Sequence, residues 1–235
     1  MDFYRSFTLA LFNDDLEGLE RLLTDGMDPN ERSSTGDTPL IAASRLAKRD
    51  CFLLKLLEHG GDLETKHAAN GQTPLIVVSQ NGILKRVRLL LKLGANPNAV
   101  DDFGQTPLYV ALVLSQKKYV GVVRELLAHG ANPNIDGPRN PLMLAAENAH
   151  SGCVEALIEA GANVNTVQDS GTPLIKAILG RRHDNLQLLL NAGADPNLSV
   201  PVECDDPQIA GRNAFEVAQL LGDSKALELL EAAQR

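Results

Sequence analysis

Histidine is the residue type in this chain with the clearest potential for catalysis, because it titrates near neutral pH and its ring nitrogens bind metals. No His-x-x-x-His or Cys-x-x-Cys spacing, Gly-x-Ser-x-Gly motif or phosphate-binding glycine loop occurs. Two of the histidines precede glycines that are expected to end helices, where a histidine interacts favourably with the helix dipole. The other three are expected in turns or loops. The sequence therefore predicts no catalytic residue, no cofactor, no metal site and no enzyme activity; the histidines are His59, His67, His129, His150 and His183.

The three cysteines, Cys51, Cys153 and Cys204, are an odd number at unrelated positions, which indicates neither a disulfide framework nor a metal site. The N-terminal residues lack the basic start and the small-residue cleavage site of a signal peptide. No apolar run reaches membrane-spanning length. We therefore expect a protein of a reducing compartment, the cytoplasm, without membrane association, and delivery into another cell stays open.

The elements that position these residues are repeated along the chain. The sequence Gly-Ala-Asn-Pro-Asn occurs at Gly94–Asn98 and at Gly130–Asn134, and near-copies begin at four other glycines. Successive glycines are separated by 34, 34, 36, 31 and 32 residues. A second marker, Thr-Pro-Leu, keeps the same phase, with Asn-Pro-Leu and Asn-Ala-Phe as variants. A constant spacing of this length indicates that one supersecondary unit has been stacked many times.

Each unit is expected to contain two helices followed by a loop. In the third unit the Thr73 hydroxyl can cap free backbone N–H groups, and Pro74 suits the first helical position. The first helix is expected to end near Asn81, and the leucine-rich segment 84–93 predicts the second helix. Gly94 then ends that helix in the left-handed region of backbone space.

One position in the first helix of every unit carries a small side chain. A small residue allows the next helix to approach closely, and leucines of the second helices then fill the space between units. One unit alone buries too little apolar surface to offset the chain entropy lost on folding, so stability must come from contacts between neighbours. The small residues are Ala10, Ala43, Val78, Ala111, Ala145, Ala177 and Ala218.

A period near 33, a Thr-Pro-Leu opening and a closing Leu-Leu-x-x-Gly-Ala-Asn/Asp-x-Asn make the sequence resemble the ankyrin-repeat family from Ser6 to the C-terminus. The resemblance implies an all-α ankyrin-repeat solenoid of about seven helix-turn-helix units with projecting hairpin-like loops. We expect a single domain over 1–235, with an N-terminal capping repeat at 1–35, five internal repeats at 36–200, and a loop insertion plus C-terminal capping repeat at 201–235.

The chain departs from the family pattern at the residue after Thr-Pro-Leu, where the family usually has histidine. The hydrogen bond of that histidine to the threonine and to adjacent loops cannot form here. We expect apolar burial to replace it, which leaves the rigidity of the loops as an open point. The residues at this position are Ile41, Ile76, Tyr109, Met143 and Ile175.

Charge is unevenly distributed along the chain. Residues 38–100 carry 9 basic and 4 acidic side chains, a net charge of +5, whereas the chain as a whole has a net charge of -8. One interpretation is that acidic ends keep an open-ended stack soluble. The other is a basic patch that attracts an acidic protein surface or nucleic acid, although an acidic chain without stacking aromatics disfavours nucleic acid. The patch would combine Arg45, Lys48, Arg49, Lys85, Arg86 and Arg88.

The resemblance also implies where a partner would bind, because loop tips and the exposed side of the first helices form a concave protein-binding surface in ankyrin-like stacks. Phe103 with Val113 and Leu114 could supply an apolar anchor there. The alternative is that Val113 and Leu114 pack against the longer turn of the fourth unit. The loop tips are expected at Ser34, Asn70, Phe103 and Asp136. The complete predicted set is Arg45, Leu46, Gln80, Asn81, Phe103, Val113, Leu114, Glu147 and Asn148.

Two irregular segments are further candidates, since insertions in repeat proteins often lie on the binding face. They are Ser115–Tyr119 and Leu198–Arg212, and the second is either part of the binding face or disordered. It contains the acidic pair Asp205 and Asp206, which we expect to be solvated.

We therefore predict a monomeric, non-catalytic protein-protein interaction module that acts as a scaffold or adaptor for another protein, whose identity the sequence does not give. Within the same class, a stoichiometric inhibitor or immunity protein and an effector delivered to another cell stay open. Nucleic-acid binding through the basic middle is a less favoured alternative. A stable spacer without a partner is the simplest rival.

Overall fold

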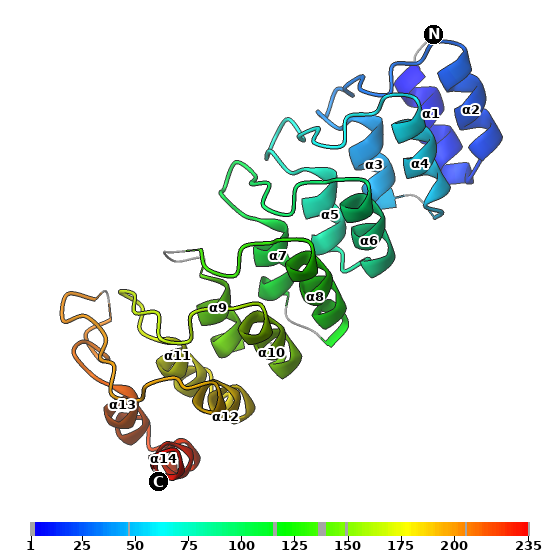
Figure 1. Cartoon of the computed structure of the whole chain (residues 1–235). Helices are drawn as coiled ribbons and strands as arrows, with labels where there is room; N and C mark the ends of the chain where they lie inside the picture. Colours follow the sequence, from blue (N-terminus) through cyan, green and yellow to red (C-terminus); the bar gives the residue numbers. More distant parts are fainter. Residues whose placement is uncertain are drawn as a thin grey trace. The chain divides into compact units, whose positions relative to one another are not determined.

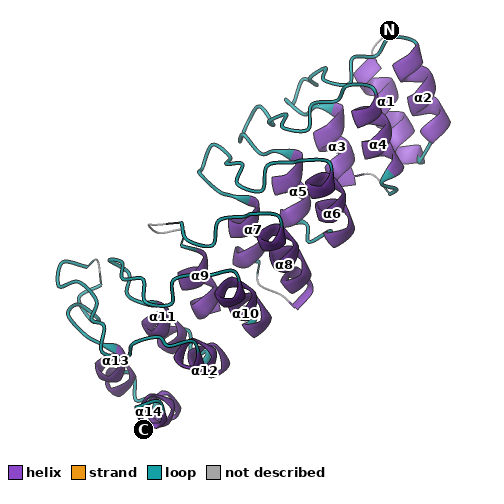
Figure 2. Ribbon diagram, viewed as in Figure 1, coloured by secondary structure: helices purple, strands orange, loops and turns teal. Residues whose placement is uncertain are grey.

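The computed structural model describes residues 3–46, 48–114, 117–135, 140–148, 150–204 and 206–234. Within these ranges the chain forms helices, loops and one isolated β-bridge, between Gln168 and Gly171, and no strand (Figures 1 and 2). The helices alternate along the chain between a first helix and a second helix of each repeat, which confirms the all-α ankyrin-type fold. The first helices are α1 (Phe3–Asn13), α3 (Pro39–Leu46), α5 (Pro74–Gln80), α7 (Pro107–Val113), α9 (Pro141–Asn148), α11 (Pro173–Leu179) and α13 (Ala214–Leu220). The second helices are α2 (Leu16–Thr24), α4 (Cys51–Glu58), α6 (Leu84–Lys92), α8 (Val120–Ala128), α10 (Ser151–Glu159), α12 (His183–Asn191) and α14 (Ser224–Ala232), and a 3-10 turn, η1 (Lys117–Tyr119), precedes α8.

The predicted helix starts are formed by side-chain caps. The Thr73 and Thr172 hydroxyls accept hydrogen bonds from the third backbone N–H of α5 and α11, at 3.4 and 3.3 Å. Asn140 does the same for α9, with 3.0 Å between its Oδ1 and the Met143 nitrogen. Asn213 begins α13 with a reciprocal capping box to Glu216. The Thr-Pro-Leu marker and its variants therefore specify helix starts by local chemistry.

The chain divides into two compact units, Met1–Val110 and Ala111–Arg235. In the first unit α3 packs against both α1 and α5, and α2 packs against α4. In the second unit α11 packs between α9 and α13, and the second helices α8, α10, α12 and α14 pack in sequence. Within the first unit, the loops that follow α2, α4 and α6 all project from the same side of the helices (Figure 2).

The small residues of the first helices are buried in every repeat, as the sequence predicts. Ala43, Val78, Ala145 and Ala177 are completely inaccessible to solvent. Leucines from the second helices, such as Leu90, complete the same apolar layer. The core is therefore a continuous layer within each unit, shared between neighbouring repeats.

Asparagines in the closing motif link the end of one repeat to the next. Asn165 donates from Nδ2 to the Gly193 carbonyl (3.2 Å) and accepts at Oδ1 from the Asp195 N–H (2.7 Å). Asn30 and Asn134 make the same pair of bonds to the repeats that follow them. The amide matches this task because one side chain supplies both a donor and an acceptor.

The projecting loops of the first unit are held by turns repeated every 34 residues, at Ser33, His67 and Asp101. Each of these side chains accepts a hydrogen bond from the backbone N–H two residues later. Neighbouring loops are also joined through the backbone, since the Ala68 N–H donates to the Gly36 carbonyl at 3.2 Å. A Cβ at Gly36 would lie 2.5 Å from the Ala68 Cβ, so this close approach requires glycine. These contacts order the loops without the histidine of the family pattern.

The residues that replace that histidine are buried at four of the five positions. Ile41, Ile76, Met143 and Ile175 are in the core, whereas Tyr109 is half-buried. The expected replacement of a hydrogen bond by apolar burial is therefore confirmed at those four positions.

The segment 198–212, apart from residue 205, forms a looped excursion with its own backbone hydrogen bonds. The Val200 N–H donates to the Arg212 carbonyl (3.0 Å), and the Gly211 N–H donates to the Val200 carbonyl (3.1 Å). Val200 and Ile209 are buried. Asp206 is exposed, as expected for a solvated acid, and Asp205 lies outside the described residues. The other irregular segment includes residues 115 and 116, which also lie outside them.

Among the described residues, no helix is both long enough and apolar enough to cross a membrane.

Replacing Ala145 with leucine should lower the free energy of unfolding by about 1 to 3 kcal/mol, because the larger side chain overpacks a contact between repeats. Denaturant unfolding measures the change. Ala128→Leu, at an exposed site at the end of α8, is the matched control and should change stability by less than about 0.5 kcal/mol. Equal stability of the two variants would show that the repeat register assigned to Ala145 is wrong.

Candidate protein-binding surface

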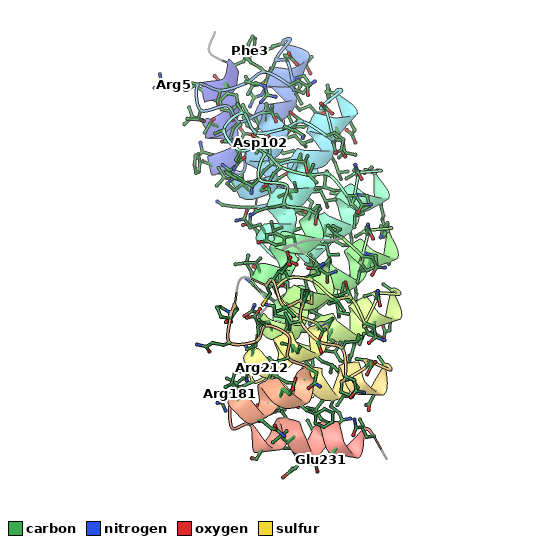
Figure 3. All side chains as sticks on the ribbon, turned by 90° about the vertical axis from the view of Figure 1, so that its left-hand side faces the viewer. Phe3, Arg5, Asp102, Arg181, Arg212 and Glu231 are labelled. Atoms are coloured by element: carbon green, nitrogen blue, oxygen red, sulfur yellow. The ribbon has the colours of Figure 1, made fainter. Side chains whose placement is uncertain are left out.

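Phe103 is an exposed aromatic side chain on a loop whose backbone is fixed. The side chain is 61% accessible. Beneath it, Asp101 Oδ1 accepts hydrogen bonds from the backbone N–H groups of Phe103 (3.0 Å) and Gln105 (2.8 Å). The next residue, Asp102, donates its N–H to the Asn70 carbonyl of the preceding loop at 3.0 Å; Figure 3 views the loop side of the molecule and labels Asp102. Phe103 is thus presented by an ordered turn.

The structure brings Arg45, Leu46, Gln80 and Asn81 to the ends of the neighbouring helices α3 and α5. All four side chains are exposed. Arg45 forms an ion pair with Asp37 at 3.3 Å. Gln80 Oε1 accepts a hydrogen bond from Gln72 at 3.2 Å. These residues lie together in the first unit, and two of them are tied to the loop that precedes their own helix.

In the second unit, Val113 and Leu114 are exposed at the end of α7. Glu147, at the end of α9, is half-buried and forms an ion pair with Lys176 of α11 at 3.2 Å, whereas Asn148 is exposed. Glu147 therefore has a structural partner in the next repeat. The other three side chains are accessible to a partner.

The predicted anchor of Phe103 with Val113 and Leu114 joins residues of different units and stays a prediction. The alternative, packing of Val113 and Leu114 on the turn of the fourth repeat, involves residues outside the described ranges. Among the other loop tips, Ser34 is exposed and Asn70 is half-buried. Asp136 lies outside the described residues.

Sequence reasoning missed Phe12, whose side chain is 60% accessible near the end of α1. Phe12 follows the buried Ala10 by two residues, as Arg45 follows Ala43 and Gln80 follows Val78. Counting two residues from each small residue would have found it. Phe12 therefore belongs to the same set of exposed first-helix positions.

The predicted basic patch is wrong for Arg86. Its side chain is only 5% accessible. The guanidinium donates to Asp50 Oδ1 (3.0 Å) and to the Ser44 carbonyl at the end of α3 (3.1 Å). A helix end leaves carbonyls without intrahelical partners, and the arginine satisfies one of them from the next repeat. Arg86 is thus a contact between repeats, and it is not available to a ligand.

Asn185 occupies the same repeat position in the second unit and plays the same role. Its Nδ2 donates to the carbonyls of Ala145 (3.3 Å) and Ala146 (3.1 Å) at the end of α9. Arg182 adds a third bond, to the Glu147 carbonyl at 3.2 Å. Both units therefore close first-helix ends with side chains from the following repeat.

Two further cations of the predicted patch, Arg49 and Lys85, also face carboxylates. Arg49 forms an ion pair with Asp14 at 2.9 Å, and Lys85 pairs with Asp50 at 2.7 Å. Burial alone would raise the pKa of Asp50, but hydrogen bonds from Lys85 and Arg86 and the charges of both outweigh it and lower that pKa. Much of the positive charge is therefore neutralised locally.

The prediction of a turn or loop for His183 is wrong, because His183 is the first residue of α12. Its Nε2 lies 2.9 Å from both carboxylate oxygens of Asp223, the residue that caps α14. Burial alone would raise the pKa of Asp223, but hydrogen bonds from His183 and from the Ala226 N–H lower it. This histidine therefore connects two repeats.

The other histidines have local structural roles. His59 and His129 end α4 and α8 as predicted, with Nδ1 at 2.9 and 3.0 Å from carbonyls of the preceding turn. His67 and His150 each accept a backbone N–H in a turn. In the part of the chain that the structure describes, no group of three or more His, Cys, Asp or Glu side chains is arranged to hold a metal ion.

The three cysteines are free thiols in different environments. Cys153 is buried, and desolvation raises the pKa of its thiol to about 11 despite the opposing charge of Arg124. Cys51 and Cys204 are partly accessible. Reactivity toward alkylating reagents should therefore be confined to Cys51 and Cys204 in the folded protein.

The fold and the comparisons define the class of protein. A family model described as ankyrin repeats (3 copies) matches residues 7–101, 46–137 and 113–200, so the chain belongs to the ankyrin-repeat family. Ankyrin repeats are generally protein-interaction modules, and proteins built from them are typically non-catalytic scaffolds.

Individual relatives are large proteins that contain similar repeats. The chain is 28% identical over 74% of its length to zebrafish (Danio rerio) neurogenic locus notch homolog protein 1, covering 8% of that protein. It is 27% identical over 92% of its length to human SH3 and multiple ankyrin repeat domains protein 2, covering 11%. It is 32% identical over 77% of its length to Caenorhabditis elegans ankyrin repeat and KH domain-containing protein mask-1, covering 7%. The chain thus spans only about a tenth of the length of these relatives.

Asp50→Asn should lower the free energy of unfolding by about 1 to 2 kcal/mol near neutral pH, because it weakens charge-assisted bonds to Lys85 and Arg86. The pKa of Asp50 is lower in the folded protein than in the unfolded chain, so the unfolded chain binds more protons between those two values. The stability from Asp50 is therefore complete above the unfolded pKa and is lost as the pH falls through the folded pKa. Urea unfolding of wild type and Asp50→Asn from about pH 7 to about pH 3 should show the difference between their free energies of unfolding becoming smaller in acid. A difference that does not change with pH would contradict this role of the Asp50 carboxylate.

Proposed function

We propose that this chain is a non-catalytic module that binds a partner protein through the exposed residues of its first helices and loop tips, the concave face of ankyrin stacks. It would act as a scaffold or adaptor. The first-helix surface consists of Phe12, Arg45, Leu46, Gln80, Asn81 and Phe103 in the first unit and of Val113, Leu114 and Asn148 in the second.

Phe103 carries this proposal. An aromatic side chain that is 61% accessible contributes little to the core. The turn beneath it is nevertheless fixed by Asp101 and by a backbone bond to the preceding loop. A rigid loop lowers the entropy lost on binding, and exposed aromatic residues are common hot spots of protein interfaces.

Nucleic-acid binding through the basic middle of the chain is less favoured than a protein partner, because several of its arginines already face carboxylates. Arg45 is paired with Asp37, and Arg49 is paired with Asp14. Arg86 is buried against Asp50. Each of these pairs removes a cation that would otherwise contact phosphate, which is the contact that dominates nucleic-acid affinity.

The test is a quantitative pull-down from a lysate of the native source with wild type, Phe103→Asp, Leu114→Asp and the control Leu93→Asp. Leu93 is also an exposed leucine but ends the second helix α6. If a partner binds the first-helix surface, Phe103→Asp or Leu114→Asp should capture at least about tenfold less of it than wild type, because loss of a hot spot costs about 2 kcal/mol or more. The control Leu93→Asp should capture as much as wild type.

Phe103→Asp and Leu114→Asp change different units, so the variant that loses the partner shows which unit carries the interface. Capture of the same protein by all four baits would move binding away from the first-helix surface. The absence of any specifically captured protein would favour a spacer role. Circular dichroism of each bait excludes unfolding as the cause of a loss.

A further inference from the structure

A groove opens between the second helices α4 and α6 of the first unit, at positions outside the first-helix surface. Its volume is about 1060 Å³. Leu54 from α4 and Leu84 and Leu89 from α6 line it, together with Cys51 and Ile83 at the starts of the two helices. Leu54 is 37% accessible, and the other four side chains are partly accessible. The groove therefore has an apolar floor that the fold does not cover.

The groove exists because α4 and α6 pack less closely than neighbouring second helices elsewhere in either unit, such as α2 with α4 or α10 with α12. The long Arg86 side chain lies between these two repeats and reaches Asp50 and the Ser44 carbonyl. The equivalent residue between α10 and α12 is the shorter Asn185. The helices α4 and α6, which have the larger arginine at this repeat position, are thus packed less closely than α10 and α12, which have the smaller asparagine.

The residues that line the groove include more cations than carboxylates, although Arg49, Lys85 and Arg86 already form ion pairs with Asp14 and Asp50. Among the lining residues, Asp50 is the single carboxylate, against six cations. Helix α6, Leu-Lys-Arg-Val-Arg-Leu-Leu-Leu-Lys, has no acidic residue, whereas each of the other six second helices has at least one. The cations are Lys48, Arg49, Lys85, Arg86, Arg88 and Lys92, all of which except Arg86 are exposed.

We propose that this groove binds an acidic amphipathic helix of a partner protein, with apolar side chains on the floor and carboxylates along the rim. The charge of the rim selects an acidic ligand. The apolar floor selects a ligand with an apolar face, and a helix presents both on opposite sides.

The dimensions of the groove limit the contact to a short segment. Helix α6 has nine residues, which corresponds to about 13 Å. A bound helix would contact the floor over roughly two to three turns, with apolar anchors at i, i+3 or i+4, and i+7. The segment is therefore a linear motif of the partner.

The lining residues favour this ligand over nucleic acid and over a membrane. No aromatic side chain lines the groove, so bases have no stacking platform. The apolar residues form the floor of a hollow between two helices, whereas a bilayer surface is engaged by an apolar face that reaches into it. Positive charge alone would suit all three ligands, and the apolar floor distinguishes them.

The probe is a fluorescein-labelled designed peptide of about 12 residues, roughly three helical turns, with leucines at the anchor positions and glutamates elsewhere. A scrambled peptide of the same composition is the control ligand. Fluorescence anisotropy should show the designed peptide binding at least about tenfold more tightly than the scrambled one. Equal binding of the two peptides would reduce the groove to a non-specific basic patch and overturn the proposal.

Two pairs of variants separate the floor from the rim. Leu54→Gln should weaken binding of the designed peptide about tenfold, whereas Leu93→Gln, an exposed leucine outside the groove, should not. Lys92→Glu should weaken binding of the designed peptide, and the loss of affinity should be larger at low salt than at high salt. Lys225→Glu, on α14, should leave the affinity unchanged. Unchanged affinity in both Leu54→Gln and Lys92→Glu would place the peptide elsewhere.

Cys51 provides a readout in the unmodified protein, because it lines the groove and Cys204 does not. Bound peptide should slow maleimide modification of Cys51 several-fold and leave Cys204 unchanged, as measured by mass spectrometry. Equal rates with and without peptide at Cys51 would overturn the proposal. The proposal would also be overturned if phosphatidylserine vesicles or duplex DNA slowed the modification of Cys51 and the designed peptide did not.

Discussion

The contact between neighbouring repeats is the constraint on which the rest of the structure depends. A helix pair exposes the face that carries its small residue unless another pair covers it. Ala145 and Ala177 are completely buried because α9 and α11 lie against each other. Within each unit, the apolar free energy gained at such contacts must offset the chain entropy that a single repeat cannot offset alone.

Polar groups at the same contacts determine which residues are left for function. Asn165 links successive loops, and Arg86 and Asn185 satisfy the carbonyl ends of the preceding first helices. These side chains are committed to the fold. Exposed residues such as Phe103 and Leu54 have no comparable task, and both lie on backbone that the repeat contacts hold in place. Both proposed binding surfaces include such residues.

The fold could be predicted from the sequence because helix caps and turns depend on residues close together in the chain. Part of the site could not be predicted, because it depends on side-chain pairs that are far apart in the sequence. The Thr73 cap and the glycines that follow the second helices from α2 to α12 act within one turn of the chain, so the repeat markers indicate helix boundaries directly. Arg86 was expected at the surface because arginine is rarely buried without a partner. Its partner Asp50 is 36 residues away, and the pairing emerges only when the repeats are stacked. His183 and Asp223, 40 residues apart, are hidden from sequence reasoning for the same reason.

Gly180→Ala tests most directly whether neighbouring repeats control stability. Gly180 ends α11 with ordinary right-handed helical torsion angles, so alanine should by local propensity stabilise the protein by about 0.4 to 1 kcal/mol. A Cβ at this position, however, would lie 2.2 Å from the Glu147 carbonyl oxygen of the preceding repeat. We predict that denaturant unfolding will show a lower free energy of unfolding for the variant, and an equal or higher value would contradict the account.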